Sequence, residues 1–175
     1  DPWQFESKET TQISVIDAEG NAVSTTYTLG SDFGSGVMVE GTGFMLGNLI
    51  SNFSIGQQAE SVAKGVAAAI NNVLGPGRRP GSSMSPTMVF GKKGLGMVTG
   101  TPGGNTIPGT VMQMIVNTVD FGMNIAEATS TARIDQQLRS GILAVEPEVS
   151  PDTLARLKQW GHQIEVSRAI GATQT

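Results

Sequence analysis

Two pairs of alternating, β-rich stretches constrain the fold of this chain more than any other feature of its sequence. The first pair covers residues 11–17 and 22–29, and the turn-forming residues 18–21 join its two members. The second pair covers residues 87–90 and 95–99, across a glycine-rich turn at residues 91–94. Alternating stretches that are joined by such short turns are typical of β-hairpins. We therefore expect two hairpins.

Helical patterns and shorter strands accompany the hairpins. Helices are expected at residues 57–74, 106–119, 124–132 and from residue 150 onward. Pro108 suits the first turn of the second of these helices, and Ser150 offers a cap to the last. Additional short strands are expected at residues 37–39, 44–46 and 142–145. This mixture of elements indicates an α+β fold in which helices cover sheets.

The composition excludes several classes of function. The 175 residues make up one domain's length, and the net charge of −4 argues against nucleic-acid binding, because phosphate contacts need a basic surface. The lack of cysteine excludes disulfides and thiolate nucleophiles. No cluster has metal-ligand spacing, and no apolar run approaches the ~20 residues of a membrane span. We expect no metal, no cofactor and no membrane span in this segment.

Thr10 is a candidate nucleophile because a threonine at a new N-terminus carries its own base. Its α-amine can take the proton of its hydroxyl, so no histidine is required, and this chain has only His162. The alternative is a threonine that simply enters a strand, and Thr10 taken without the other motifs favours that alternative. Glu9 precedes it, so the nucleophile would be latent until the Glu9–Thr10 bond breaks.

Two further motifs carry possible chemistry. The backbone N–H groups of Gly103-Gly104 can point at one oxygen, as an oxyanion hole requires, although the pair by itself favours a simple turn between a strand and a helix. The paired hydroxyls of Ser82-Ser83 can hold a carboxylate, or they can cap a local turn.

Other motifs have ordinary structural explanations and do not point to a function. Residues 61–64 match the Ser-x-x-Lys pattern of penicillin-binding enzymes, but the partner motifs are missing. Residues 91–96 resemble a phosphate loop but join two strands, so we interpret them as a hairpin turn. His162 follows a helix end, and we expect it to be a solvated surface residue. The sequon at residues 52–54 matters only in a secreted eukaryotic protein.

Taken in order, several landmarks resemble the small-subunit half of the gamma-glutamyltransferases. They are Thr10-Thr11, Asp17, residues 20–23, residues 26–28, Phe33-Gly34, residues 79–87, Gly103-Gly104 and residues 171–174. The resemblance implies a four-layer αββα sandwich of the N-terminal-nucleophile hydrolase class. It also implies two subunits cut from one precursor, and it allows a periplasmic or secreted location.

The resemblance assigns a role to each candidate residue. Thr10 would cut the chain by attacking the Glu9 carbonyl and would then form an acyl ester with the substrate, a γ-glutamyl amide such as glutathione. Water or an acceptor amine would release the acyl group. Thr28 would orient Thr10 through a hydrogen bond. Ser82 and Ser83 would hold the α-carboxylate of the substrate, and Gly103 and Gly104 would form the oxyanion hole.

This sequence departs from the family at the positions that grip the substrate's amino group. Gly30 and Leu49 offer no side-chain acceptor, and a third position, usually aspartate, is Asn52. An amide attracts an ammonium group far more weakly than a carboxylate does. A glutaryl-like acyl group without the α-amine is therefore a rival substrate. The His-Tyr pair that often follows the threonines is Gln12-Ile13 here.

The resemblance also suggests the organisation of the chain. Residues 1–9 would be the tail of the large-subunit region, and residues 10–175 would be the nucleophile domain without its last strand. The large subunit of the same precursor would supply an arginine for the substrate carboxylate. A family member that never matures and only binds an acidic ligand is the alternative of another class, because the Glu9–Thr10 bond is intact as written.

Overall fold

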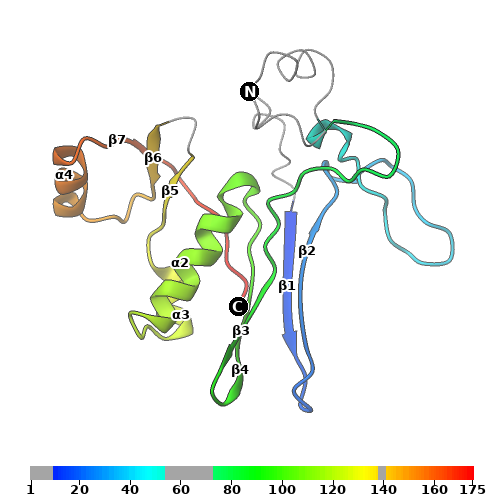
Figure 1. Cartoon of the computed structure of the whole chain (residues 1–175), viewed down its shortest axis with the longest axis horizontal. Helices are drawn as coiled ribbons and strands as arrows, with labels where there is room; N and C mark the ends of the chain where they lie inside the picture. Colours follow the sequence, from blue (N-terminus) through cyan, green and yellow to red (C-terminus); the bar gives the residue numbers. More distant parts are fainter. Residues whose placement is uncertain (1–9, 54–72, 138–140) are drawn as a thin grey trace. The chain divides into compact units, whose positions relative to one another are not determined.

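The computed structural model describes residues 10–53, 73–137 and 141–175. Figure 1 shows their helices and strands along the chain. The chain divides into two compact units, one within residues 1–10 and 27–83 and the other formed by residues 11–26 and 84–175. No helix in the described ranges is long and apolar enough to cross a membrane.

The first predicted hairpin is confirmed. Strand β1 covers Thr10–Ile16, strand β2 covers Ala22–Thr28, and the two strands form one sheet. The turn closes where the Asp17 backbone N–H donates to the Asn21 carbonyl at 3.0 Å, and both side-chain oxygens of Asp17 accept hydrogen bonds from Asn21. Gly20 has a φ of 87°, a conformation that favours glycine at this position of the turn.

The second predicted hairpin is also confirmed. Strands β3 (Thr87–Gly91) and β4 (Gly94–Thr99) pair in antiparallel fashion, with an irregularity between Val89 and Phe90. Lys92 and Lys93 form the turn between the two strands, so the glycine-rich residues 91–96 join strands and do not open a helix. This geometry agrees with the hairpin interpretation and not with a phosphate loop.

Two helices pack on the second hairpin and form the core of its unit. Helix α2 covers Ile107–Val119 with Pro108 in its first turn, and helix α3 covers Ile125–Ser130. Asn124 caps α3, and Asn124 and Glu127 exchange the two hydrogen bonds of a capping box. The buried core joins one residue from β4, one from α2 and one from α3: Met97, Met114 and Ala128.

The C-terminal half adds a three-stranded sheet with a helix beside it (Figure 1). Strand β5 (Ile134–Gln136) pairs antiparallel with β6 (Ile142–Val145), and β6 pairs in parallel with β7 (Gln163–Val166). Helix α4 (Pro151–Gln159) connects the two parallel strands, and the Ser150 side chain caps it by accepting from the Thr153 N–H. The predicted β6 and the predicted start of α4 are confirmed.

Several predictions about elements were incomplete or wrong. Residues 37–39 and 44–46 form only one isolated bridge, Met38 to Met45, because glycines with positive φ interrupt the chain on either side. Helix α3 ends at Ser130, two residues before the predicted end at residue 132. Most of the predicted helix at residues 57–74 lies outside the described residues, and its described end, residues 73–74, is not helical.

Short 3-10 turns and unpredicted strands complete the chain. The 3-10 turns are η2 (Ile50–Asn52) and η4 (Gly104–Thr106). Strands β5 and β7 were not predicted, because three or four residues are too few for a clear alternation. His162 precedes β7 and is partly exposed, which is compatible with the expected surface position.

Candidate active site

The first part of the candidate site is a pair of threonine hydroxyls at the open end of the first hairpin. Thr10 begins β1 and Thr28 ends β2, and both are equally distant in sequence from the turn residues Asp17 and Asn21. The Thr10 Oγ1 donates a hydrogen bond to the Thr28 Oγ1 at 3.2 Å. This is the contact that the family resemblance implies. Thr10 is half-buried.

Gln12, two residues after Thr10, has a structural role that the sequence did not reveal. Its side chain is only 6% exposed. Its Oε1 accepts a hydrogen bond from the Thr26 Oγ1 at 2.6 Å, and its Nε2 donates to the Ser24 Oγ at 3.0 Å. Ser24 in turn donates to the carbonyl of Thr99, at the end of β4. Gln12 therefore connects β1, β2 and the end of β4.

The second part of the candidate site is the turn that contains Gly103 and Gly104. Gly103 has a φ of 142° and Gly104 a φ of 59°, and both values favour glycine. A Cβ atom on Gly103 would lie 2.7 Å from the Thr106 Oγ1. Both the N–H and the Oγ1 of Thr106 donate to the Gly103 carbonyl, at 3.2 and 2.9 Å. The turn therefore requires glycine and is held by the first residues of the following helix.

The serine pair and Asn52 belong to the compact unit of residues 1–10 and 27–83, which also contains Thr10 and Thr28. Asn52 ends η2, and its Nδ2 donates a hydrogen bond to the carbonyl of Gly81 at 3.0 Å. Ser82 and Ser83 follow Gly81 directly, in a segment without regular structure. Within this unit the structure thus brings Asn52 beside the chain that carries both serines.

Gly30 and Leu49, the two positions without a side-chain acceptor, lie against each other in that same unit. A Cβ atom at Gly30 would overlap the carbonyl oxygen of Asn48 and would lie 3.3 Å from the Leu49 Cδ2. Gly30 also has a φ of 86°. The backbone in this chain therefore has no room for a polar side chain at residue 30.

Among the described residues, neither a metal-binding cluster nor the shifted carboxyl of Asp17 coincides with the candidate residues. Within the described ranges, no group of three or more His, Asp or Glu side chains could hold a metal ion. The Asn21 side chain lowers the pKa of Asp17, but this carboxyl lies at the far turn of the hairpin. A surface pocket of about 320 Å³ lies on α4 and contains none of the candidate residues. Its lining residues are Asp152, Thr153, Arg156, Leu157 and Trp160.

Comparison with known proteins identifies relatives over nearly the whole chain. A family model described as Gamma-glutamyltranspeptidase matches residues 2–175. A glutathione hydrolase proenzyme of Escherichia coli is 43% identical over 171 residues, which are 98% of this chain and 29% of that protein. The chain thus spans less than a third of the length of this relative.

Solved structures agree with the sequence comparison. A mutant of the Helicobacter pylori gamma-glutamyltranspeptidase has a TM-score of 0.76 and 36% identity, over 93% of this chain and 88% of that chain. A cephalosporin acylase from Bacillus halodurans has a TM-score of 0.72 and 29% identity, over 93% of this chain and 28% of that chain.

These matches confirm the expected fold class. The chain is α+β in its described elements, and its structural relatives have the fold of N-terminal-nucleophile hydrolases. Together with the family model and the identity to the Escherichia coli protein, they show that this chain belongs to the gamma-glutamyltranspeptidase family.

Proposed function

We propose that this chain carries the nucleophile of a self-processing amidase and acyltransferase that cleaves γ-glutamyl amides. The observation that carries the proposal is the hydrogen bond between the Thr10 and Thr28 hydroxyls, in a chain of this family. Residues 1–9 are then the tail of the large-subunit region, and residues 10–175 are the nucleophile domain. Glu9 and the rest of that tail lie outside the described residues.

Self-cleavage is the first chemical step. The Thr10 Oγ1 attacks the carbonyl carbon of Glu9, and the bond between that carbon and the Thr10 nitrogen breaks as the nitrogen takes a proton. The resulting ester between the Glu9 carbonyl and the Thr10 Oγ1 is opened by water. This leaves a free carboxylate on Glu9 and a free amine and hydroxyl on Thr10.

The same hydroxyl then acts on the substrate. The Thr10 amine takes the hydroxyl proton while Oγ1 attacks the substrate amide carbonyl, and the backbone N–H groups of Gly103 and Gly104 stabilise the oxyanion. The leaving amine departs with the proton, and an acyl ester remains on Thr10. Water or an acceptor amine then releases the acyl group. No cofactor takes part in these steps.

Thr28 acts as a positioning residue in this scheme. Its Oγ1 accepts the hydrogen bond from the Thr10 Oγ1 at 3.2 Å, which restricts the rotation of the Thr10 side chain about χ1. Orientation of a nucleophile is worth a large rate factor, because misplacement by about 1 Å can cost about 10²-fold in rate. Thr28 therefore supports an attack geometry that Thr10 would otherwise have to find by rotation.

The residues around the acyl group of the substrate give a second candidate for the acyl donor. Ser82 and Ser83 would hold the substrate carboxylate in either case. Gly30 and Leu49 provide no side-chain acceptor for an α-ammonium group, and Asn52 offers a neutral amide where the family usually has a carboxylate. This arrangement, and the relative named a cephalosporin acylase, favour a glutaryl-like acyl donor as the alternative.

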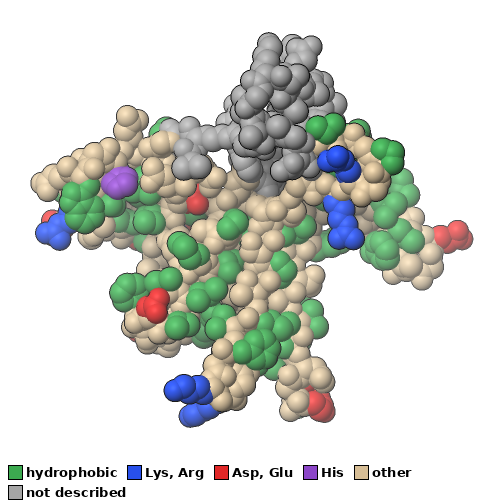
Figure 2. All heavy atoms as spheres, viewed as in Figure 1, with side chains coloured by type: hydrophobic (Ala, Val, Ile, Leu, Met, Phe, Trp, Pro, Cys, Tyr) green, Lys and Arg blue, Asp and Glu red, His purple; other side chains and the backbone are tan. Residues whose placement is uncertain are grey.

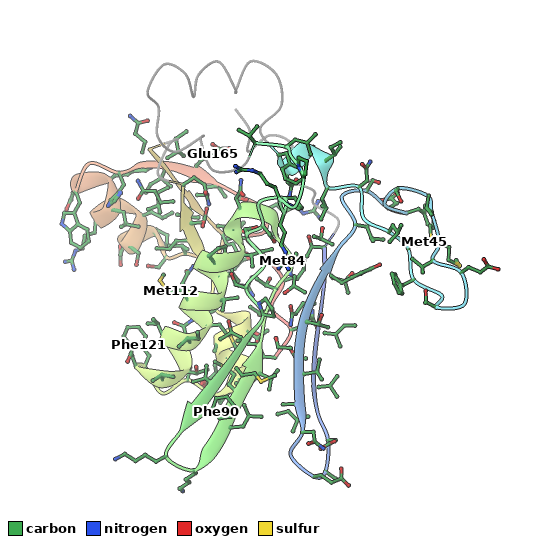
Figure 3. The ribbon with its side chains drawn as sticks, turned by 45° about the vertical axis from the view of Figure 1, so that its right-hand side comes forward. Met45, Met84, Phe90, Met112, Phe121 and Glu165 are labelled. Carbon is green, nitrogen blue, oxygen red and sulfur yellow. The ribbon has the colours of Figure 1, made fainter. Side chains whose placement is uncertain are left out.

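A large-subunit partner from the same precursor is the third part of the proposal. The chain spans 29% of the Escherichia coli proenzyme, yet it covers 88% of the Helicobacter pylori chain. Hydrophobic side chains are also exposed on both hairpins (Figure 2). In the second unit, Phe90 is 69% and Phe121 70% exposed, and both lie on the outside of the ribbon (Figure 3). Apolar exposure of this extent supports a further chain segment that covers it.

Intact mass and N-terminal sequencing of the full-length precursor test the central claim. After prolonged incubation we expect a new N-terminus at residue 10 in the wild type and in Thr10→Ser, and an uncut chain in Thr10→Ala. If the wild-type chain stays whole, the proposal of an enzyme is wrong, and the protein is a family member that only binds an acidic ligand. That protein would bind its ligand equally well as the Thr10→Ala variant.

A pair of chromogenic anilides separates the two acyl donors. The processed enzyme is assayed with a γ-glutamyl anilide and with a glutaryl anilide, which differ only in the α-amino group. A larger kcat/KM for the γ-glutamyl anilide supports the first candidate, and a larger value for the glutaryl anilide supports the acylase. Thr10→Ala should lack both activities, which excludes a contaminating enzyme.

A further inference from the structure

The C-terminal segment of the chain packs directly on the glycine turn of the candidate site. A Cβ atom on Gly103 would lie 3.0 Å from the Cα of Gly171, so the two backbones touch with no side chain between them. The Ala172 N–H donates to the Thr101 Oγ1 at 2.7 Å, and the Gln174 N–H donates to the Gly100 carbonyl at 2.9 Å. Residues 171–174 therefore pack against the turn and the residues that lead into it.

Gly171 has no room for a side chain. Its φ is 71°, and a Cβ at this residue would lie 2.9 Å from the Oγ1 atoms of both Thr101 and Thr110. Both threonines are fully buried. Gly171 therefore packs between Gly103 of the turn and the two buried hydroxyls of Thr101 and Thr110.

A buried carboxylate fixes the residue before Gly171. The Oε1 of Glu146 accepts a hydrogen bond from the Ile170 N–H at 2.7 Å, and Ile170 itself is buried. Glu146 is 8% exposed and follows β6. A carboxylate accepting a backbone N–H makes a strong, charge-assisted hydrogen bond. This one links the end of the sheet to the C-terminal segment.

Arg133 holds the Glu146 carboxylate in turn. Its backbone N–H donates to the Oε2 at 2.8 Å, and its Nη1 lies 3.2 Å from the Oε1. The other guanidinium nitrogen, Nη2, donates to the Thr129 carbonyl at 2.6 Å and to the Thr173 Oγ1 at 3.4 Å. Arg133 thus adds a second contact to the C-terminal segment, at Thr173, three residues after the Ile170 N–H that Glu146 binds.

A buried ion pair by itself adds little to stability, since the free energy needed to take both charges out of water offsets most of their attraction. Here both charges also bind backbone or side-chain groups of the C-terminal segment. We propose that Glu146, supported by Arg133, is a positioning residue that holds Gly171 against Gly103 and so sets the Gly103 and Gly104 amides for catalysis. The inference rests on the proposed function, because it assigns those amides to the oxyanion.

Kinetics on the processed full-length enzyme test this role. Glu146→Gln keeps the shape of the side chain and removes its charge, so the Ile170 N–H and Arg133 both lose a charged partner. Because an oxyanion exists only in the transition state, we expect kcat to fall by about 10- to 100-fold with KM within about twofold. Affinity for a boronic acid that forms a tetrahedral adduct on Thr10 should fall by a similar factor.

Controls separate positioning from general loss of structure. Glu148→Gln changes an exposed carboxylate two residues further on and should leave kcat, KM and boronate affinity unchanged. Arg133→Lys keeps the positive charge but loses the fork of donors, and it should give a smaller fall in kcat. If Glu146→Gln does not fold, Glu146→Asp replaces it, with the same kinetic expectation.

Hydrogen exchange provides a readout that does not depend on activity. Backbone amides of residues 100–106, followed by mass spectrometry, should exchange faster in Glu146→Gln and unchanged in Glu148→Gln. Unaltered exchange, or a folded variant with wild-type kcat and boronate affinity, overturns the inference. A wild-type protein that neither cleaves itself nor turns over substrate overturns the proposed function. Faster exchange in Glu146→Gln would in that case still show that Glu146 supports the glycine turn.

Discussion

Replacing Gly100 by alanine tests whether the buried amide of Gln12 holds the second unit together. Gly100 follows β4, and a Cβ atom there would overlap the Cδ, Oε1 and Nε2 atoms of Gln12. The φ of Gly100 is not in the left-handed region, so alanine can adopt the same backbone conformation. The penalty must therefore come from the Gln12 side chain, which has to move aside.

The size of the penalty follows from the bonds that Gln12 loses. Its Oε1 accepts one hydrogen bond from Thr26. Its Nε2, which carries two hydrogens, lies within hydrogen-bond distance of the Ser24 Oγ, the Ile13 carbonyl and the Ser14 Oγ. Displacement breaks up to three hydrogen bonds that contribute about 1 kcal/mol each. We expect Gly100→Ala to lower the free energy of unfolding by about 2–3 kcal/mol.

Urea unfolding of four purified full-length proteins measures this coupling: wild type, Gly100→Ala, Gln12→Ala and the double variant. In the Gln12→Ala background the overlap is gone, and Gly100→Ala should cost less than about 1 kcal/mol. Gly96→Ala is the matched control, because its Cβ would meet only the Val89 carbonyl, at 3.6 Å. Equal penalties for Gly100→Ala in both backgrounds would refute the reasoning.

Three further predictions follow from single contacts. Thr28→Val removes the acceptor of the Thr10 hydroxyl and should lower kcat by about 10- to 100-fold while the protein stays folded; an unchanged kcat would remove Thr28 from the mechanism. Asn124→Ala deletes the cap of α3 and should lower the free energy of unfolding by about 1 kcal/mol in urea, whereas Asn124→Asp should cost less. The Asn21 side chain depresses the pKa of Asp17 below its ordinary value of 3.8, so the stability that this pair adds is present above that value and is lost as the pH falls through the lower, folded pKa. Carboxyl NMR titration should show the Asp17 pKa rising in Asn21→Ala, and no rise would contradict the assigned cause.

Local sequence signals predicted the elements whose causes lie within a few neighbouring residues. The turn at residues 18–21 and the glycine-lysine turn at residues 91–94 specify both hairpins, because turn residues and alternation act over short distances. Pro108 and Ser150 likewise marked the starts of α2 and α4. Where such signals were short or interrupted, as at residues 37–39 and in β5, the prediction failed.

The candidate site was predictable only in its list of residues. Thr10, Thr28, Gly103 and Gly104 were proposed from resemblance to a family, and the equal distance of both threonines from the hairpin turn explains why Thr10 faces Thr28. Gln12 had no local signal, because a glutamine in a strand is ordinarily exposed. Only the approach of Ser24 to the Thr99 carbonyl, far along the chain, shows why that amide is buried.

The sequence by itself determined the two hairpins, the helices α2 and α4, the absence of cysteine chemistry and the choice of Thr10 as the candidate nucleophile. Tertiary structure decided what supports the glycine turn. Glu146 binds the Ile170 N–H, and Gly171 touches Gly103, although these residues are far apart along the chain. Propensity and periodicity act within a few residues, whereas a buried carboxylate finds its partner only after the sheet and the C-terminal segment have packed together.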